Sequence, residues 1–200
     1  MLSKIQISGA NKGLKVILND YVSDYNRICE ESRRAYVATL APGAVVPPAG
    51  RIYTEDDKQR MEALADGYRN KAATIIDGIM QELKDELTAA PSSDAVNTIT
   101  LLRMRDEIKP GEVRDLLDKY GDNPQAHKTI ISIAMDKGCH LDPFTDYTHP
   151  AERMGARVED LKASIENYID PNKTSNTLAN IEGSRAFMDM NIDSALPAND

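Results

Sequence analysis

The sequence predicts an all-α protein in which a long antiparallel helical hairpin, coiled-coil-like in character, is followed by a cluster of short helices. Three observations lead to this prediction. Apolar residues recur at three- and four-residue steps over two long segments. Prolines and glycines divide the rest of the chain into short segments. Alternating patterns typical of strands are almost absent. The chain has 200 residues and is 41% hydrophobic, which is enough apolar material for a folded core.

The first long helix is expected from about residue 11 to residue 40, because apolar side chains follow one helical face there. These positions are Leu14, Ile17, Leu18, Tyr21, Val22, Tyr25, Ile28, Cys29, Tyr36, Val37 and Leu40. Pro42-Gly43 ends the pattern. Residues 1–10 are expected to form an extended arm, since Ile5 and Ile7 alternate with polar residues.

Residues 51–54 are a second segment with extended character. A whole hairpin separates it from residues 4–8, so the two segments are poorly placed to pair within one chain. We expect two unpaired extended arms, because an isolated two-stranded ribbon is only marginally stable. Pairing of these segments between chains is the alternative.

The second long helix is expected to begin after Thr54, whose side chain can cap it, with acidic residues in the positive first turn. The apolar positions that follow are Met61, Leu64, Tyr68, Ala72, Ile75, Ile76, Ile79, Met80, Leu83 and Leu87. The pattern ends near Ala90-Pro91, which makes a rod of about 50 Å at 1.5 Å per residue. Such a rod needs a partner for its apolar face, and the first helix supplies one. We therefore expect a hairpin over residues 11–91.

Short helices are expected to form a bundle over residues 92–193. Each expected helix begins at a capping residue or a proline: near Ser93, Pro110, Asn123-Pro124, Pro150 and Ser175. Gly121 and Gly138 end two of them. Residues 194–200 are expected to be a flexible tail.

Charge and composition exclude several classes of protein. The net charge is −8, which disfavours a generally basic nucleic-acid binder, and residues 141–200 alone carry −6. No apolar run approaches the length of a membrane span, so no membrane association is expected. Two distant cysteines and the absence of a signal-like start favour a reducing compartment. We expect a cytoplasmic protein, not a secreted one, and no cofactor.

The connector after the 124–137 helix holds the best metal candidates, Cys139, His140, Asp142, Asp146 and His149. Thiol, imidazole and carboxylate groups are the ligands that zinc prefers. Their spacing matches no zinc signature, however, and Asp142-Pro143 is typical of a turn in which the aspartate bonds nearby backbone. The turn is the favoured interpretation.

Enzymatic chemistry has little support in the sequence. Cys139 could pair with His127, His140 or His149 as a nucleophile, but no surrounding motif supports this. Cys29 lies on the apolar face of the first helix and is expected in the core. No phosphate-binding glycine loop is present. No enzyme activity is therefore expected.

The expected helices 110–120 and 124–137 have the spacing of a helix-turn-helix. The second of them carries few basic residues for a helix that would lie in a DNA groove. A helical hairpin that packs on its neighbours is favoured, and nucleic acid is not an expected partner.

Two segments, Asn97–Asp106 and Lys119–Lys128, resemble small helical proteins of tailed phages and prophages of Gram-positive bacteria. The similarity covers about residues 55–135 and is structural rather than catalytic, so it transfers no active-site residue. It implies a virion or head-assembly component with a long amino-terminal helical region. Such a protein acts by self-association and by docking to other virion proteins.

Three hypotheses for function follow. The first is a non-enzymatic, homo-oligomeric assembly protein of the phage type, with a self-association interface on the hairpin formed by Tyr21, Tyr25, Tyr68, Ile75, Ile79 and Leu83. The second is a monomeric adaptor or regulator that binds a peptide or nucleic acid through residues 92–140. The third is an enzyme that uses the 139–149 connector.

Overall fold

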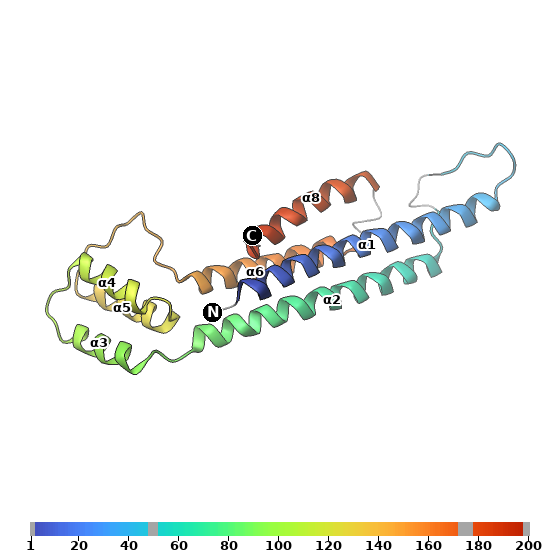
Figure 1. Cartoon of the computed structure of the whole chain (residues 1–200). Helices are drawn as coiled ribbons and strands as arrows, with labels where there is room; N and C mark the ends of the chain where they lie inside the picture. Colours follow the sequence, from blue (N-terminus) through green and yellow to red (C-terminus); the bar gives the residue numbers. More distant parts are fainter. Residues whose placement is uncertain (1–2, 48–51, 172–177, 198–200) are drawn as a thin grey trace. The chain divides into compact units, whose positions relative to one another are not determined.

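The computed structural model describes residues 3–47, 52–171 and 178–197, with only the backbone for 178–183. These residues form helices and connecting turns, with no strand among them, so the predicted all-α class is confirmed (Figure 1). The chain divides into two compact units. We call Ser3–Ile79 with Arg157–Asp200 the long-helix unit and Met80–Ala156 the short-helix unit. Helices α2 and α6 each contribute residues to both.

Helix α1 spans Lys4–Ala38, so the extended arm predicted for residues 1–10 is wrong for residues 4–10, and residues 1–2 lie outside the described part of the chain. A reciprocal cap explains the early start: the Gln6 backbone N–H donates to Ser3 Oγ at 3.2 Å, and the Ser3 backbone N–H donates to Gln6 Oε1 at 2.9 Å. This capping box satisfies two backbone donors that a helix otherwise leaves free. The alternation of Ile5 and Ile7 predicted a strand, but the cap favours the helix. Of the second predicted arm, 52–54 is not a strand and residue 51 lies outside the described residues.

Helix α2 spans Glu55–Thr88 and begins at the predicted cap. The Asp57 N–H donates to Thr54 Oγ1 at 3.1 Å, and the Thr54 N–H donates to Asp57 Oδ2 at 3.0 Å. In the long-helix unit, Arg60 pairs with Glu31 at 2.8 Å, and the Tyr68 hydroxyl donates to Asp24 at 2.8 Å. The order of these pairs runs oppositely along the two helices, which confirms the antiparallel hairpin.

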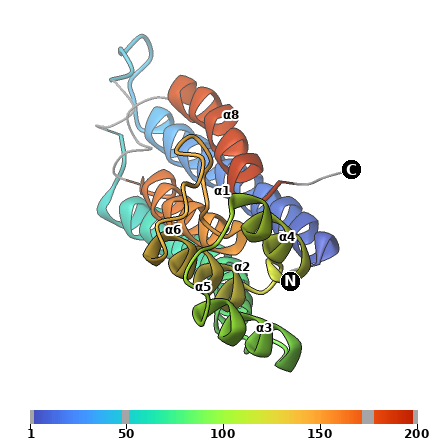
Figure 2. The ribbon, with the colours of Figure 1, turned by 90° about the vertical axis from the view of Figure 1, so that its left-hand side faces the viewer.

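Helices α6 (Pro150–Tyr168) and α8 (Leu178–Ala195) complete the long-helix unit. Figure 2 looks down this group, with α1, α2, α6 and α8 clustered together. Tyr168 of α6 lies edge-on to Tyr21 with ring centroids 6.5 Å apart, and Lys162 pairs with Asp77 of α2 at 2.8 Å. The units therefore differ from the predicted division into residues 11–91 and 92–193, because the last two helices cover the hairpin.

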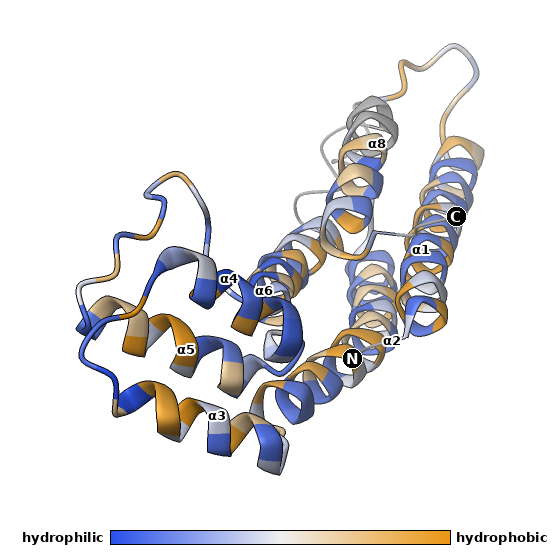
Figure 3. Ribbon diagram, turned by 60° about the vertical axis from the view of Figure 1, so that its left-hand side comes forward, coloured by the Kyte–Doolittle hydropathy of each residue, from blue (hydrophilic) through white to orange (hydrophobic). Residues whose placement is uncertain are grey.

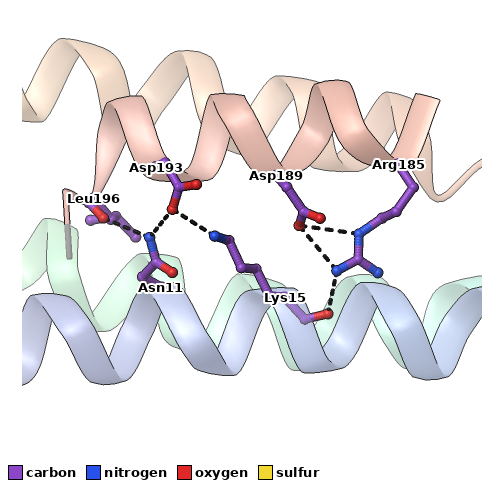
Figure 4. A network of polar contacts seen from close by, with 6 residues as sticks. All are labelled: Asn11, Lys15, Arg185, Asp189, Asp193 and Leu196. Atoms are coloured by element: carbon purple, nitrogen blue, oxygen red, sulfur yellow. Dashed lines mark hydrogen bonds and ion pairs between the residues drawn. The ribbon is translucent and has the colours of Figure 1, made fainter. Parts of the chain in front are cut away.

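A polar network fastens α8 to α1 (Figure 4). The buried Asn11 side chain donates through Nδ2 to Asp193 Oδ1 and to the Leu196 carbonyl, both at 2.8 Å, and Lys15 pairs with Asp193 at 2.6 Å. Arg185 donates to the Lys15 carbonyl at 2.9 Å. Leu196 is only 1% exposed. The flexible tail predicted for 194–200 is therefore wrong for residues 194–196, and 198–200 lie outside the described residues.

The short-helix unit contains α3 (Ser93–Arg103), α4 (Pro110–Tyr120) and α5 (Pro124–Asp136). Ser92 caps α3 and Asn123 caps α5. Helix α5 lies between α3 and α4 (Figure 3), and its buried residues include Ile130, Ile131 and Ile133. The core is formed mainly by Ala95, Ile99, Leu102, Ile108, Val113, Tyr120, Ala126, Ile130, Ile131, Ile133 and Ala134.

Candidate functional site

The connector between α5 and α6, residues 139–149, is an ordered loop. Helix α5 ends where Gly138 adopts a φ of +67°, and the Cys139 N–H then bonds the Ala134 carbonyl at 2.9 Å. This left-handed ending favours glycine, because a side chain there would be strained. Farther along, Leu141 and Tyr147 pack against the core of the short-helix unit. The loop is thus fixed to the unit at both ends.

Asp142 organises the tip of this connector. Its Oδ1 accepts the Phe144 N–H at 3.0 Å, its Oδ2 accepts the Thr145 hydroxyl at 2.7 Å, and its N–H donates to the Tyr147 hydroxyl at 3.2 Å. The bond from the Phe144 backbone lowers the pKa of the Asp142 carboxyl, and the Thr145 bond adds to this effect. The predicted turn role of Asp142 is therefore confirmed, and its carboxylate is ionised at neutral pH.

Asp146 performs the same role four residues later. Its Oδ1 accepts the Thr148 N–H and its Oδ2 pairs with Arg153 of α6, both at 2.9 Å. The bond from the Thr148 backbone is the main reason that the pKa of Asp146 falls to about 2. Two fixed carboxylates therefore flank the loop tip.

Phe144 lies between these two aspartates and is 96% exposed. An exposed phenylalanine costs little by itself, but here it is carried by a loop whose backbone is already held by side-chain hydrogen bonds. Because the backbone that carries Phe144 is already ordered, binding of its ring costs little backbone entropy, which suits an anchor in a protein interface. We call residues 142–146 the Phe144 loop.

A second feature of the same unit is an open groove of about 520 Å³ between the end of α3 and the outer face of α5. Arg103, Lys128 and Lys137 line it, with Asp136 as the acidic lining residue and buried Ile133 as the apolar one. None of the three cations has an ion-pair partner within the described part of the chain. We call this the basic groove. It is positive although residues 92–140 are slightly acidic as a whole.

His149 caps α6 rather than serving as a free ligand. It is 2% exposed, and its Nδ1 accepts the Ala151 N–H at 3.1 Å. Its ring lies edge-on to His127 of α5, with centroids 5.3 Å apart. Burial lowers the pKa of His127, and the neighbouring His149 lowers it further. The folded unit therefore favours the neutral form of His127.

The predicted metal candidates are not brought together. Asp142 and Asp146 bond the loop backbone, His149 caps a helix, and His140 is exposed. Over residues 3–47, 52–171 and 178–197, no three side chains of metal-binding type are close enough to share an ion. The connector is explained by turn chemistry.

The predicted self-association residues are core residues of the single chain. Tyr21 contacts Tyr25 and Tyr68, with ring centroids 5.9 and 5.8 Å away, and all three are buried. Ile79 and Leu83 are buried as well, and Ile75 is half-buried. The prediction that this hairpin face is exposed and binds another chain is therefore wrong, because helices of the same chain cover it.

Cys29 lies in the core of the hairpin, as predicted. Burial raises the pKa of its thiol, which keeps it protonated and unreactive. The buried hydroxyl of Tyr25, one helical turn earlier, has no hydrogen-bond partner among the described residues, and burial raises its pKa too. These groups form a neutral, buried cluster.

Sequence reasoning missed both the Phe144 loop and the basic groove. Phe144 was overlooked because its segment was considered only for metal ligands. Asp142, followed three residues later by Thr145, is nevertheless a recognisable turn signal. Lys128 and Lys137 belong to α5 and its C-terminal cap, but Arg103 lies at the end of α3 and joins them only when α3 packs on α5.

None of the described helices is both long enough and apolar enough to cross a membrane. No family model matches the chain, and neither a curated protein nor a solved structure matches it.

Proposed function

We propose that this protein is a non-enzymatic assembly protein of the phage or prophage type, which acts by binding further copies of itself and other virion proteins. The proposal keeps the class of function that the sequence resemblance implies. It moves the binding surface from the hairpin to the short-helix unit.

The observation that carries this proposal is the exposure of large apolar side chains on a unit that already has a closed core. Five of them lie on the short-helix unit: Val96, Leu101, Met104, Met135 and Phe144. The long-helix unit carries the other six exposed large apolar residues of the described chain, among them Phe187 and Met190. Such residues are typical of protein-binding surfaces where several lie close together, and Leu101 and Met104 are three residues apart at the end of α3. Methionines suit such surfaces because they adapt their shape to a partner.

The polar groups of the connector also favour binding over catalysis. Asp142, Asp146 and His149 each hold backbone N–H groups, so their hydrogen-bonding capacity serves the loop. A general acid or base needs a group that is free to exchange a proton with a substrate.

The second candidate is a monomeric adaptor or regulator that binds a peptide or nucleic acid through residues 92–140. The basic groove favours this candidate, because three cations without ion-pair partners attract an anionic ligand. Salt-sensitive retention of the protein on DNA or on an acidic peptide would support it.

The test of the first candidate is the molar mass in solution, measured by light scattering after size exclusion over a concentration series at two salt levels. A mass that rises above the 22.1 kDa of one chain as concentration increases is the expected result. A constant 22.1 kDa at every concentration would overturn self-association and leave the adaptor as the better proposal.

A further inference from the structure

We propose that copies of this chain associate head to tail, with the Phe144 loop of one copy seated in the basic groove of the next. This inference rests on the self-association proposed above and names the two surfaces that meet. Both belong to the short-helix unit, so every copy carries one loop and one groove.

The loop provides an aromatic anchor with two fixed negative charges. Phe144 is 96% exposed, and Asp142 holds its backbone through the Phe144 N–H. Asp146 is locked in place by Thr148 and Arg153. Asp146 is already paired with Arg153, whereas Asp142 has no ion-pair partner among the described residues. An ionised carboxylate has about four acceptor sites, so the exposed Asp142 can still accept from a cation of a partner.

The groove provides the complementary surface. Arg103, Lys128 and Lys137 place three positive charges around it and Asp136 places one negative charge, and Ile133 is its apolar lining residue. The aliphatic parts of the lysine and arginine side chains add apolar surface beside a bound ring. With about 520 Å³ of space, the groove has the size of an ordinary ligand site.

Charge and placement together select a second copy as the occupant. An acidic loop with an aromatic tip matches a cationic groove with an apolar lining residue, and complementary charges steer such surfaces together. Phe144 is 96% exposed, so the loop does not fill the groove of its own chain. Two different surfaces that bind each other make a heterologous contact, which builds rings or open chains instead of stopping at a dimer.

The first experiment compares single variants by light scattering over the same concentration series. Phe144→Ala is expected to weaken association at least about tenfold, as loss of an interface anchor does. The matched control is Phe187→Ala, which removes the other phenylalanine of the chain, 63% exposed on α8 of the long-helix unit. Lys128→Glu is expected to act like Phe144→Ala, whereas Lys84→Glu, the same charge change on an exposed residue of α2 outside the groove, is expected to have little effect.

The second experiment mixes the two defective variants. Phe144→Ala retains a functional groove and Lys128→Glu retains a functional loop, so one good contact remains between them. The mixture is expected to form a species of two chains that grows no further at higher concentration. Higher salt is expected to weaken this species, because it screens the exposed charges. Unchanged helical circular dichroism of each variant shows that the fold is retained.

The outcomes separate this inference from the proposed function. If the wild-type chain associates and both variants associate equally well, the loop and groove are not the interface, although self-association stands. If Phe144→Ala dissociates the assembly but the mixture stays monomeric, the loop binds another surface and the assignment of the groove is overturned. If the wild-type chain is monomeric throughout, both proposals fail.

Discussion

The contacts within the short-helix unit join residues that are close in the sequence, whereas contacts within the long-helix unit join residues that are far apart in it. In the short-helix unit, Tyr120 donates to Asp94, 26 residues away, and Gln125 donates to the Leu87 carbonyl, 38 residues away. In the long-helix unit, Asn11 reaches Leu196 across 185 residues. One continuous segment can therefore form the first core, whereas the second needs both ends of the chain. Contacts that are distant in sequence are slower to form and easier to lose locally.

The largest expected effect comes from cutting a cavity into each core in turn. Ile76→Ala in the long-helix unit and Ile130→Ala in the short-helix unit remove the same atoms from fully buried sites. Each is expected to cost about 2–5 kcal/mol of unfolding free energy. Hydrogen exchange measures where protection is lost, and we expect the loss to stay in the unit that carries the substitution. Equal loss in both units for either variant would show that they unfold together.

The next largest effect concerns the attachment of α8. Asn11→Ala removes both donors to Asp193 and Leu196 and leaves the buried carbonyl unpaired. A cost of about 1–3 kcal/mol is expected, since an unsatisfied buried group retains its desolvation penalty. Limited proteolysis should then cut the α8 region faster while the short-helix unit remains protected. Asn70→Ala, on the exposed side of α2, serves as the control, and equal cleavage of the two variants would contradict the role of the network.

Acidification is expected to lower the free energy of unfolding of the short-helix unit by a smaller amount. Burial and His149 lower the pKa of His127 in the folded state, with Arg153 acting in the same direction and Glu152 against it. In the unfolded chain His127 binds a proton near pH 6.5, whereas in the folded chain it does so only at lower pH. Stability that is present above about pH 6.5 is therefore lost as the pH falls below it. Asp142 and Asp146, with lowered pKa values, stay ionised between pH 7 and pH 5 and do not contribute in this window.

Thermal unfolding at pH 7 and at pH 5 measures this effect. The His127→Gln variant should lose part of the pH dependence, whereas the exposed His140→Gln variant should keep it. An identical pH dependence in wild type and His127→Gln would show that the histidine pair does not couple to folding.

The smallest expected effect is a difference in the stability gained by replacing two glycines of the long-helix unit with alanine. Gly67→Ala in α2 has open space around the new Cβ, and it should gain about 1 kcal/mol from better helix propensity. Gly13→Ala in α1 should gain less, because its Cβ would lie 3.0 Å from Ile75 Cδ1 and that side chain must move. Chemical denaturation of the two variants measures the difference. An equal gain would mean that Ile75 moves aside at no cost.

Local signals in the sequence predicted most helix boundaries. Thr54, Pro110, Asn123-Pro124 and Gly138 act within one turn of the chain, and the structure uses each as expected. The start of α1 was missed because the apolar alternation near Ile5 competed with a capping box that outweighed it. The candidate site was harder to predict, since exposure and the meeting of distant cations are not properties of short segments.

The sequence by itself determined that this is a helical protein, where most of its helices start and stop, and that Asp142 makes a turn. Each of these depends on hydrogen bonds and sterics within a few residues. Only the tertiary structure decided which chain covers the hairpin face around Tyr21: α6 and α8 of the same molecule bury it. Tertiary packing likewise decided that Phe144 faces solvent and that Arg103 joins Lys128. An apolar pattern in the sequence shows that a helix face must be covered, but it does not show by what, because the hydrophobic effect is non-directional.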